Sequence, residues 1–363
     1  MAGWRLATKL DDRLHDKIGR DTTRRSAISR GDDVPSISAA KNFLVTGGAG
    51  FIGSHLSERL LEAGHRVMVI DDLSTGSMKN IEHLIGREGF HFARDTVTNE
   101  LVLDRLMSQA EVVVHLAAAV GVQFIVERPV HTIETNVGGT EVVLKTALRY
   151  GAKVLIASTS EVYGKGSKIP FCEDDDVLLG NTAKSRWAYA ASKMIDEFLG
   201  LAYHREHGLN VVCFRLFNTV GPRQTGHYGM VIPRFVSAGL SGESIPIYGD
   251  GTQSRCFCDV SDVIRAIHGL AEHPDAVGRV FNIGGLEEVS MNALAERVKA
   301  ITGGKSEIHR VPYSEAYAPG FEDMQRRQPD ISRIGSLIGW KPELALDDIL
   351  VRVRDWMLAS KRS

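Results

Sequence analysis

Two residues four positions apart, Tyr189 and Lys193, are of the types that together can remove a proton from a hydroxyl group. Their spacing places both side chains on one face of a helix, one turn apart. A free phenol has a pKa of about 10 and is a poor base at neutral pH. A neighbouring ammonium favours the phenolate, which makes Tyr189 a candidate general base. For this pair taken alone, the alternative is an aromatic residue on the buried face of a structural helix.

A second group of reactive side chains, Ser158-Thr159-Ser160-Glu161, directly follows the apolar run Val154–Ala157. The run is short and aliphatic, which predicts a buried strand. In open α/β sheets, ligands bind at the carboxyl ends of the strands. We therefore expect this group to face the same site as Tyr189, with Ser158, Ser160 and Glu161 as candidate catalytic residues.

A glycine-rich turn over residues 47–53 lies between the predicted strand Asn42–Thr46 and a predicted helix over Ser54–Ala63. Glycines at such a junction let the backbone approach a pyrophosphate, and the helix N-terminus offers it free N–H groups. Asp71 follows the next predicted strand, where a carboxylate accepts hydrogen bonds from the adenosine ribose. Because a carboxylate repels a 2′-phosphate, the sequence predicts NAD rather than NADP.

Other residues at strand ends complete the predicted cofactor site. Asp72 is the alternative partner of the ribose, and Asp95 is placed to reach the adenine. The small residues after His115 allow the cofactor to lie against the backbone. Its positively charged nicotinamide ring would further favour the Tyr189 phenolate. The candidate cofactor-binding residues are Gly47, Gly50, Phe51, Ile52, Gly53, Asp71, Asp72, Asp95, Leu116, Ala117, Ala118, Asn136, Tyr189 and Lys193.

Short apolar runs alternate with helical patterns along most of the chain, which predicts parallel βαβ units. The fold class is therefore α/β, a doubly wound parallel Rossmann sheet with a smaller C-terminal α/β lobe. Residues 1–40 are expected to be a poorly ordered extension with one short helix around Asp11–Ile18. Residues 41–217 form the predicted NAD-binding domain. Residues 218–363 form mainly a substrate-binding lobe, interleaved with further sheet elements over about 256–283. The remaining predicted elements are strands over Arg66–Ile70, Val112–His115, Val211–Phe214 and Val280–Ile283, and helices over Asn136–Tyr150 and Ala188–His207.

Composition excludes several functional classes. The 363 residues carry 43 basic and 45 acidic side chains, so no overall positive field attracts nucleic acid. No apolar stretch reaches the roughly 20 residues that a membrane-spanning helix needs. Four cysteines, at positions 172, 213, 256 and 258, show no metal-binding spacing, so no metal site is predicted. Such cysteines are typical of reduced thiols in a cytoplasmic protein.

Taken together, these motifs identify a family resemblance over about Lys41–Ser363. The chain resembles the extended short-chain dehydrogenases/reductases of the nucleotide-sugar epimerase/dehydratase/decarboxylase group. The resemblance implies the same Rossmann fold with bound NAD, a UDP-linked sugar as substrate, and a homodimer formed through a helix pair. The matching motifs are GGAGFIG (47–53), HLAA (115–118), STSEVYG (158–164), YAASK (189–193), RLFNTVGPR (215–223), YGDGTQSR (248–255) and RRQPDIS (326–332).

The resemblance also implies roles for individual residues. Ser158 and Tyr189 would hydrogen-bond the C4 oxygen of the sugar, and Lys193 would orient the nicotinamide ribose. Asn218 would meet the diphosphate, and Arg255 would pair with a phosphate oxygen, to which a guanidinium is well matched. The full set of candidate substrate-binding residues is Asn218, Arg223, Arg234, Tyr248, Gln253, Arg255 and Arg327.

The reactions of this group begin with oxidation at C4 and differ in the fate of the 4-keto sugar. Ser160-Glu161 stands where dehydratases have Asp-Glu, so dehydration is disfavoured. Ser-Glu at this place, and Arg327 followed by Gln-Pro-Asp, resemble the UDP-glucuronate decarboxylases. The Lys184–Trp187 run resembles the decarboxylases that make 4-keto-pentoses. Arg327 would hold the substrate carboxylate, and Glu161 would relay a proton to the carbon that loses CO₂. A diphosphate contact for Arg327 and a structural role for Glu161 are the alternatives.

Two other functions stay open. The loop Ala119-Val120-Gly121-Val122 is closer to that of the UDP-sugar 4-epimerases, which makes C4 epimerisation the main alternative to decarboxylation. Some proteins of this fold bind a dinucleotide as regulators without chemistry. Such proteins usually lack the Tyr/Lys pair, whereas this chain keeps Tyr189 and Lys193.

Overall fold

The computed structural model describes residues 39–226, 230–316 and 324–361, and residues 40–363 form one compact unit. The predicted helix over residues 11–18 lies outside the described residues, as does nearly all of the predicted extension. Within the described ranges, no helix combines the length and the apolar character needed to cross a bilayer.

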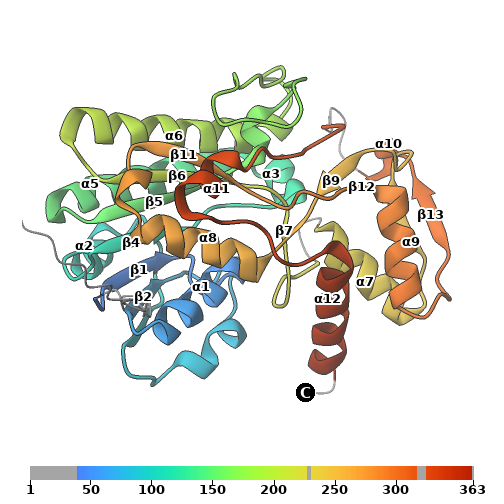
Figure 1. Cartoon of the computed structure of the whole chain (residues 1–363), viewed down its shortest axis with the longest axis horizontal. Coiled ribbons are helices and arrows are strands. Elements are labelled where there is room, and N and C mark those ends of the chain that lie inside the picture. Colours follow the sequence, from blue (N-terminus) through green and yellow to red (C-terminus); the bar gives the residue numbers. More distant parts are fainter. Residues whose placement is uncertain (1–38, 227–229, 317–323, 362–363) are drawn as a thin grey trace, which may run out of the picture. The chain divides into compact units, whose positions relative to one another are not determined.

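A sheet of seven parallel strands forms the centre of the fold (Figure 1), so the predicted doubly wound Rossmann fold is confirmed. The strand order is β11-β6-β5-β4-β1-β2-β3. From β1 the chain adds β2 and β3 on one side and then β4, β5 and β6 on the other, so the order of addition switches sides between β1 and β4. Ligands bind at such a switch point in open α/β sheets. The strands are β1 (Asn42–Thr46), β2 (Arg66–Ile70), β3 (Phe90–Ala93), β4 (Val112–His115), β5 (Lys153–Thr159), β6 (Val211–Leu216) and β11 (Arg279–Ile283).

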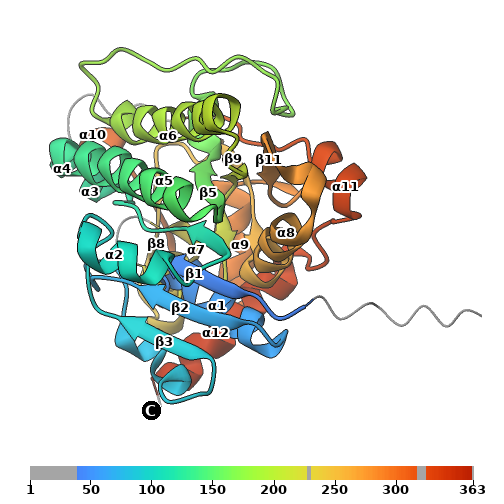
Figure 2. The ribbon, with the colours of Figure 1, turned by 90° about the vertical axis from the view of Figure 1, so that its left-hand side faces the viewer.

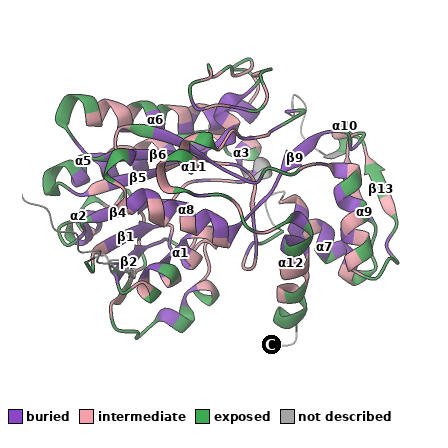
Figure 3. Ribbon diagram, in the orientation of Figure 1, coloured by how far each residue is buried: buried purple, intermediate pink, exposed green. Residues whose placement is uncertain are grey.

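Helices cover both faces of this sheet (Figure 2) because successive strand residues point to opposite sides. Phe43 and Val45 pack with one set of helices, and Leu44 packs with the other. The first set is α1 (Phe51–Glu62), α8 (Val260–Glu272) and α11 (Ser332–Ile338). The second is α2 (Glu100–Met107), α5 (Gly139–Tyr150) and α6 (Arg186–His207). Figure 3 shows the buried strands between the half-buried helices.

Residues after β6 build a separate hydrophobic core from three helices, α7 (Val231–Ser241), α9 (Met291–Ile301) and α12 (Leu346–Ser360). Three two-stranded pairings accompany it. These are β8 (Ile245–Tyr248) with β13 (Ile308–Val311), β9 (Ser254–Cys256) with β12 (Glu288–Ser290), and β7 (Thr219–Val220) with β10 (Cys258–Asp259). Shorter helices are α3 (Val122–Glu127), α4 (Pro129–Ile133) and α10 (Tyr313–Ala316).

The strands predicted at Asn42–Thr46, Arg66–Ile70 and Val112–His115 have the same bounds in the structure. The other predicted strands and helices differ from the structure at one or both ends. Differences near the site are the following. The helix after the glycine turn begins at Phe51, α5 begins at Gly139 after a π-helical turn (Glu134–Gly138), and β5 continues to Thr159. The extension of β5 matters most, because it decides which way the side chains of Ser158 and Thr159 point.

Candidate active site

The turn after β1 brings the backbone of two strands and a helix into contact. Gly47 has φ +69°, and a Cβ there would lie 2.8 Å from the backbone nitrogen of Ala117. A Cβ on Gly53 would lie 2.3 Å from the carbonyl oxygen of Gly47. Gly50 caps α1 without a side-chain hydrogen bond, so the first N–H groups of the helix, from Phe51 and Ile52 onward, are open to an anion.

Carboxylates stand at the ends of β2 and β3, as predicted. Asp71 is buried and accepts hydrogen bonds from the backbone of Ala49 and Leu73, at 2.9 and 2.8 Å. Burial raises the pKa of its carboxyl. Asp72 is exposed and accepts from the nitrogen of Ser74. Asp95 is half-buried and bonded to Thr96 and Asn99. Asp71 is therefore the carboxylate held beside the glycine turn.

The segment after β4 lies on the other side of the switch point, in contact with the end of β1. The nitrogen of Ala117 donates to Thr46 Oγ1 at 3.1 Å, which fixes the segment of Leu116, Ala117 and Ala118 against the turn. Asn136 is buried; its Oδ1 accepts from the nitrogen of Ala119, and its Nδ2 donates to Ser192 Oγ on α6. These features form a glycine-lined cradle with a helix N-terminus and an acidic side chain, which fits a dinucleotide.

Tyr189 lies near the start of α6, and the side chain of Thr159, at the end of β5, lowers the pKa of its phenol. The preceding residue, Ser158, points elsewhere: its hydroxyl donates to Glu197. Ser158 is predicted to bind the C4 oxygen of the sugar together with Tyr189, but in the structure the residue whose side chain acts on Tyr189 is Thr159. The physical reason is that β5 continues to Thr159, and neighbouring side chains of a strand alternate in direction.

The surrounding protein shifts the pKa of the Tyr189 phenol upward. Burial raises the pKa of its phenol, and the carboxylates of Glu161 and Asp196 raise it further. Lys193, one turn away on α6, places its Nζ 2.6 Å from Asp196 Oδ2. The expected ammonium is thus present, but its charge is shared with a carboxylate.

Glu161 lies between two arginines. Arg186 donates to Glu161 Oε2, and Arg327 Nη1 lies 3.4 Å from Glu161 Oε1. Burial would raise the pKa of the Glu161 carboxyl, but Arg186, Arg327 and Arg255 hold it below its usual value. Arg327 also donates to Asn218 Oδ1 at 3.5 Å. The structure therefore brings Glu161, Asn218, Arg255 and Arg327 together.

Arg186 was not singled out from the sequence as a site residue. It is 3% exposed and begins α6, one helical turn before Tyr189. An arginine preceding the tyrosine by three residues was a usable signal, because i and i+3 share a helix face. Ser160, by contrast, is buried at the start of a 3₁₀ turn (Ser160–Tyr163) that positions Glu161.

The remaining predicted substrate-binding residues lie in two places. Arg234, on α7, stacks its guanidinium 4.2 Å from the ring centre of Tyr248, and Gln253 donates to the carbonyl oxygen of Tyr248. Arg255 donates to the carbonyl oxygen of Ser254. Arg223 contacts α1 instead, pairing with Glu58 at 2.8 Å.

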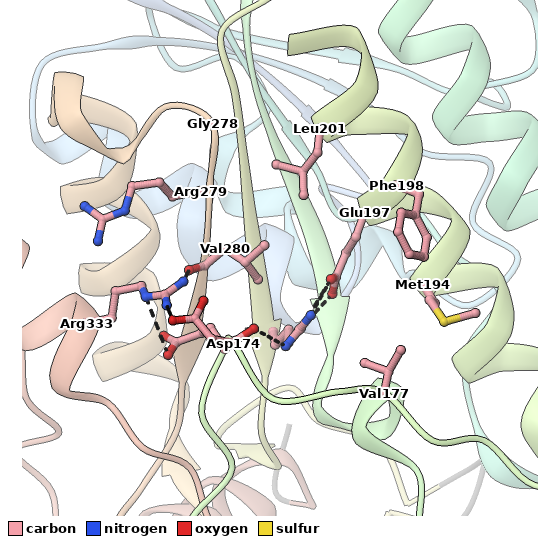
Figure 4. A pocket seen from close by; sticks show the side chains of 12 residues that line it. Asp174, Val177, Met194, Glu197, Phe198, Leu201, Gly278, Arg279, Val280 and Arg333 are labelled. Atoms are coloured by element: carbon pink, nitrogen blue, oxygen red, sulfur yellow. Dashed lines mark hydrogen bonds and ion pairs between the residues drawn. The ribbon is translucent and has the colours of Figure 1, made fainter. Parts of the chain in front are cut away.

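Residues of α6 and β11 line a cavity of about 340 Å³ (Figure 4). Glu197, Met194 and Leu201 line it from α6, and Val280 lines it from β11. Glu197 pairs with Arg215 in addition to accepting from Ser158. The hydroxyl of Ser158 is therefore committed to this network and not to Tyr189.

Asn282 of β11 fastens the segment that leads from β5 toward α6. Its Oδ1 accepts from the hydroxyl of Tyr163, and its Nδ2 donates to the carbonyl oxygen of Phe171. Its backbone nitrogen donates to Glu173. All of these groups are buried, so β11 supports the approach to the catalytic helix as well as the sheet.

Comparisons with known proteins agree with this geometry. Residues 43–284 match the NAD dependent epimerase/dehydratase family. A UDP-N-acetyl-alpha-D-glucosaminuronate decarboxylase of Bacillus cytotoxicus is 41% identical over 87% of this chain and 97% of its own length. UDP-glucuronic acid decarboxylase 1 of Danio rerio is 33% identical over 94% of this chain and 80% of its own.

A solved structure gives the same result in three dimensions. It is the UDP-glucuronic acid 4-epimerase of Bacillus cereus in complex with UDP-glucuronic acid and NAD. This chain superimposes on it with a TM-score of 0.80 and 29% identity, over 88% of this chain and 99% of that one. With the glycine turn, the Tyr/Lys pair and the family match in agreement, the chain belongs to the NAD dependent epimerase/dehydratase family.

Proposed function

We propose that this protein is an NAD-dependent decarboxylase of a UDP-linked hexuronic acid. The observation that carries the proposal is the position of Glu161 between Arg186 and Arg327. The Glu161 carboxylate also acts on Tyr189, because it raises the pKa of the phenol. Arg255 acts on the same carboxylate. A guanidinium binds carboxylate and phosphate oxygens well, so a cluster of arginines around Glu161 fits a substrate that carries both a diphosphate and a carboxylate.

The chemistry assigns a task to each group. Tyr189 would accept the proton of the C4 hydroxyl, and NAD held by the cofactor residues would supply a reversible hydride acceptor for C4. The resulting 4-keto uronate is a β-keto acid, so the C5–carboxyl bond breaks with its electron pair moving toward the C4 oxygen. CO₂ leaves, and C5 gains a proton relayed by Glu161. Tyr189 gives its proton back to the C4 oxygen when the ketone is reduced.

The cofactor residues fit this scheme. The open N-terminus of α1 and the turn at Gly47 and Gly53 would hold the pyrophosphate, and Asp71 would hold the adenosine ribose. Elements after Asn218 would form the substrate lobe, with Tyr248 and Gln253 near the nucleotide. The curated relatives named above are decarboxylases of UDP-linked uronates, which supports the same substrate class.

The test is incubation with NAD⁺ and either UDP-glucuronate or UDP-N-acetylglucosaminuronate, followed by mass spectrometry and proton NMR. We expect loss of CO₂ and a UDP-pentose product from at least one of the two. The Tyr189→Phe variant serves as the inactive control. If neither substrate changes while the enzyme binds NAD, decarboxylation of UDP-uronates is excluded.

C4 epimerisation is the second candidate, favoured by the loop at Ala119–Val122 and by the match to a UDP-glucuronic acid 4-epimerase. The same experiment separates the two. An epimerase leaves the mass unchanged and produces galacto-type proton couplings.

We also propose that the protein is a cytoplasmic homodimer. All four cysteines are free, as in a reducing compartment. Apolar side chains exposed on α4, α5 and α6 offer the helix-pair interface that the family resemblance implies, namely Val130, Ile133, Leu148, Ile195 and Phe198. Light scattering coupled to size exclusion should give twice the mass of the chain, and Phe198→Glu should reduce it to one chain.

A further inference from the structure

Arg223 has a backbone conformation that favours glycine, in a tight turn directly after β7. The backbone nitrogen of Gln224 donates to the carbonyl oxygen of Gly221 at 3.4 Å, so Pro222 and Arg223 are the two central residues of the turn. Arg223 has φ +67°. Proline followed by a positive φ is the pattern of a type II turn, whose second central residue is ordinarily glycine or asparagine. An arginine there is strained, and such strain persists only where surrounding contacts hold it.

The Arg223 side chain makes such contacts with α1, the helix whose open N-terminus faces the glycine turn. Its Nη1 lies 2.8 Å from Glu58 Oε2 and donates to Ser54 Oγ at 3.3 Å. Ser54 is buried, and the side chains of Arg223 and Glu58 are 20% and 24% exposed. Burial would raise the pKa of the Glu58 carboxyl, but Arg223 and His83 hold it below its usual value. Arg223 and Glu58 therefore form an ion pair that ties the turn to the helix.

The backbone of the turn is fastened to the same helix. His55 of α1 donates from its Nε2 to the carbonyl oxygen of Pro222 at 3.0 Å, since a carbonyl oxygen can only accept. On the other side, a Cβ at Gly221 would lie 2.6 Å from Cγ1 of Val260, the first residue of α8. The turn is thus packed between α1 and α8.

The same short segment begins at Asn218, the residue predicted to meet the substrate diphosphate. Asn218 Nδ2 donates to the carbonyl oxygen of Cys256 at 2.9 Å, next to the predicted phosphate ligand Arg255. Gln224 Nε2 donates back to the carbonyl oxygen of Thr219 at 2.9 Å, so the segment is closed by its own hydrogen bonds. One compact piece of chain therefore joins the candidate substrate site to the helix of the candidate cofactor site.

We propose that Arg223 is a positioning residue that fixes the Asn218 segment relative to α1, so that binding of the dinucleotide strengthens binding of the nucleotide-sugar. The proposal rests on the proposed function only in taking a UDP-linked sugar as the substrate. Arg223 touches neither ligand in this assignment and acts through Glu58 and Ser54. Without the ion pair the strained turn relaxes away from α1, and the two sites bind their ligands independently. Because linkage is reciprocal, each ligand tightens the other by the same factor.

The first test measures the Kd of UDP by calorimetry, without NAD⁺ and with saturating NAD⁺. For the wild type we expect NAD⁺ to tighten UDP binding about two- to fivefold, the fold-change that one partly exposed ion pair supplies. Arg223→Gln and Glu58→Gln should each bring this ratio close to one, and the double variant should have no further effect. Arg223→Lys keeps a positive charge beside Glu58 and should restore most of the ratio. A wild-type ratio in Arg223→Gln overturns the proposal.

The matched control is Lys41→Gln. Lys41 pairs with Glu272 of α8 at 2.7 Å, and the two side chains are 28% and 26% exposed, so the pair is similar in length and exposure. This variant should leave the ratio unchanged. Arg223→Gly separates the side chain from the backbone, because glycine accepts a positive φ without strain. It should lose the ratio as Arg223→Gln does while melting at no lower temperature, and a wild-type ratio in Arg223→Gly would show that the guanidinium is not needed.

A second measurement needs no nucleotide-sugar. Amide hydrogen exchange is followed in a peptide covering residues 217–226, with and without NAD⁺. NAD⁺ should slow the exchange in the wild type and in Lys41→Gln, but not in Arg223→Gln. Exchange that NAD⁺ does not slow in the wild type overturns the proposal even if UDP-uronates prove to be the substrates. Slowing that depends on Arg223, in a protein that does not bind UDP, supports the proposal and instead contradicts the proposed substrate.

Discussion

Replacing Thr159 by valine removes the hydroxyl that lowers the pKa of the Tyr189 phenol while keeping the β-branched shape at the end of β5. The loss of one donor beside a reacting oxygen typically costs about 100-fold in kcat. We expect a loss of that order for Thr159→Val, measured as release of CO₂ from the UDP-uronate that proves active. Ser158→Ala should retain most of the kcat and instead lower the melting temperature, because it disturbs the buried Glu197 network. The reverse ranking would support the predicted role of Ser158 at the C4 oxygen of the sugar.

Arg186 offers a second prediction at the scale of a single residue. Arg186→Gln removes one of the two guanidinium groups beside Glu161, so an anionic sugar loses a charge partner. We expect KM for the UDP-uronate to rise about tenfold or more, with little change in the affinity for UDP itself. Arg326→Gln is the matched control, since Arg326 is exposed and pairs with Glu288. If the two variants change KM for the UDP-uronate equally, Arg186 does not contact the substrate.

At the scale of elements, the start of α1 depends on the absence of a side chain at Gly53. A Cβ there would lie 2.3 Å from the carbonyl oxygen of Gly47, so Gly53→Ala must displace either the helix or the turn. We expect NAD⁺ binding to fall by at least about tenfold in calorimetry. Gly138→Ala is the control, because a Cβ at Gly138 meets nothing within 4 Å. Normal NAD⁺ binding by Gly53→Ala would show that the turn yields.

Elements and their order were largely predictable from the sequence, whereas side-chain directions at the site were not. The apolar runs at Asn42–Thr46 and Val112–His115 matched strands to the residue, because buried parallel strands read as continuous aliphatic runs. Ser158 was misplaced because its strand ends in polar residues, which a hydrophobic pattern does not extend through. Arg186 was missed because its importance comes from a partner distant in the sequence, Glu161.

On the scale of the whole molecule, buried neutral histidines predict acid sensitivity. Burial lowers the pKa of His115 to about 3 and also lowers those of His65 and His268, whose Nε2 atoms lie 3.3 Å apart. The unfolded chain has histidines near pKa 6.5, so it binds more protons than the folded chain below that pH. Their contribution to stability is therefore complete above about pH 6.5 and declines as the pH falls.

The measurement is the free energy of unfolding by urea from pH 7.5 down to 4.5. We expect the wild type to lose stability steadily, with about 3 kcal/mol of the loss due to His115. His115→Gln should flatten the curve, whereas His91→Gln, at an exposed position, should leave it unchanged. A His115→Gln curve parallel to that of the wild type would contradict the neutral assignment of this histidine.

Asn282 gives the fold a consequence for synthesis. The strand that carries it, β11, is the last strand of the sheet to leave the ribosome, and until then β6 is an open edge of the kind that other chains can pair with. The segment fastened by Asn282, from Tyr163 through Glu173, is made more than 100 residues earlier. In that interval it has earlier buried contacts, such as the one from Arg215 to the carbonyl oxygen of Glu173, but not the hydrogen bonds of Asn282. A nascent chain can therefore complete the glycine turn well before it completes the approach to Tyr189. Cofactor binding should precede catalytic competence as the protein is made, and chains ended before residue 279 should aggregate.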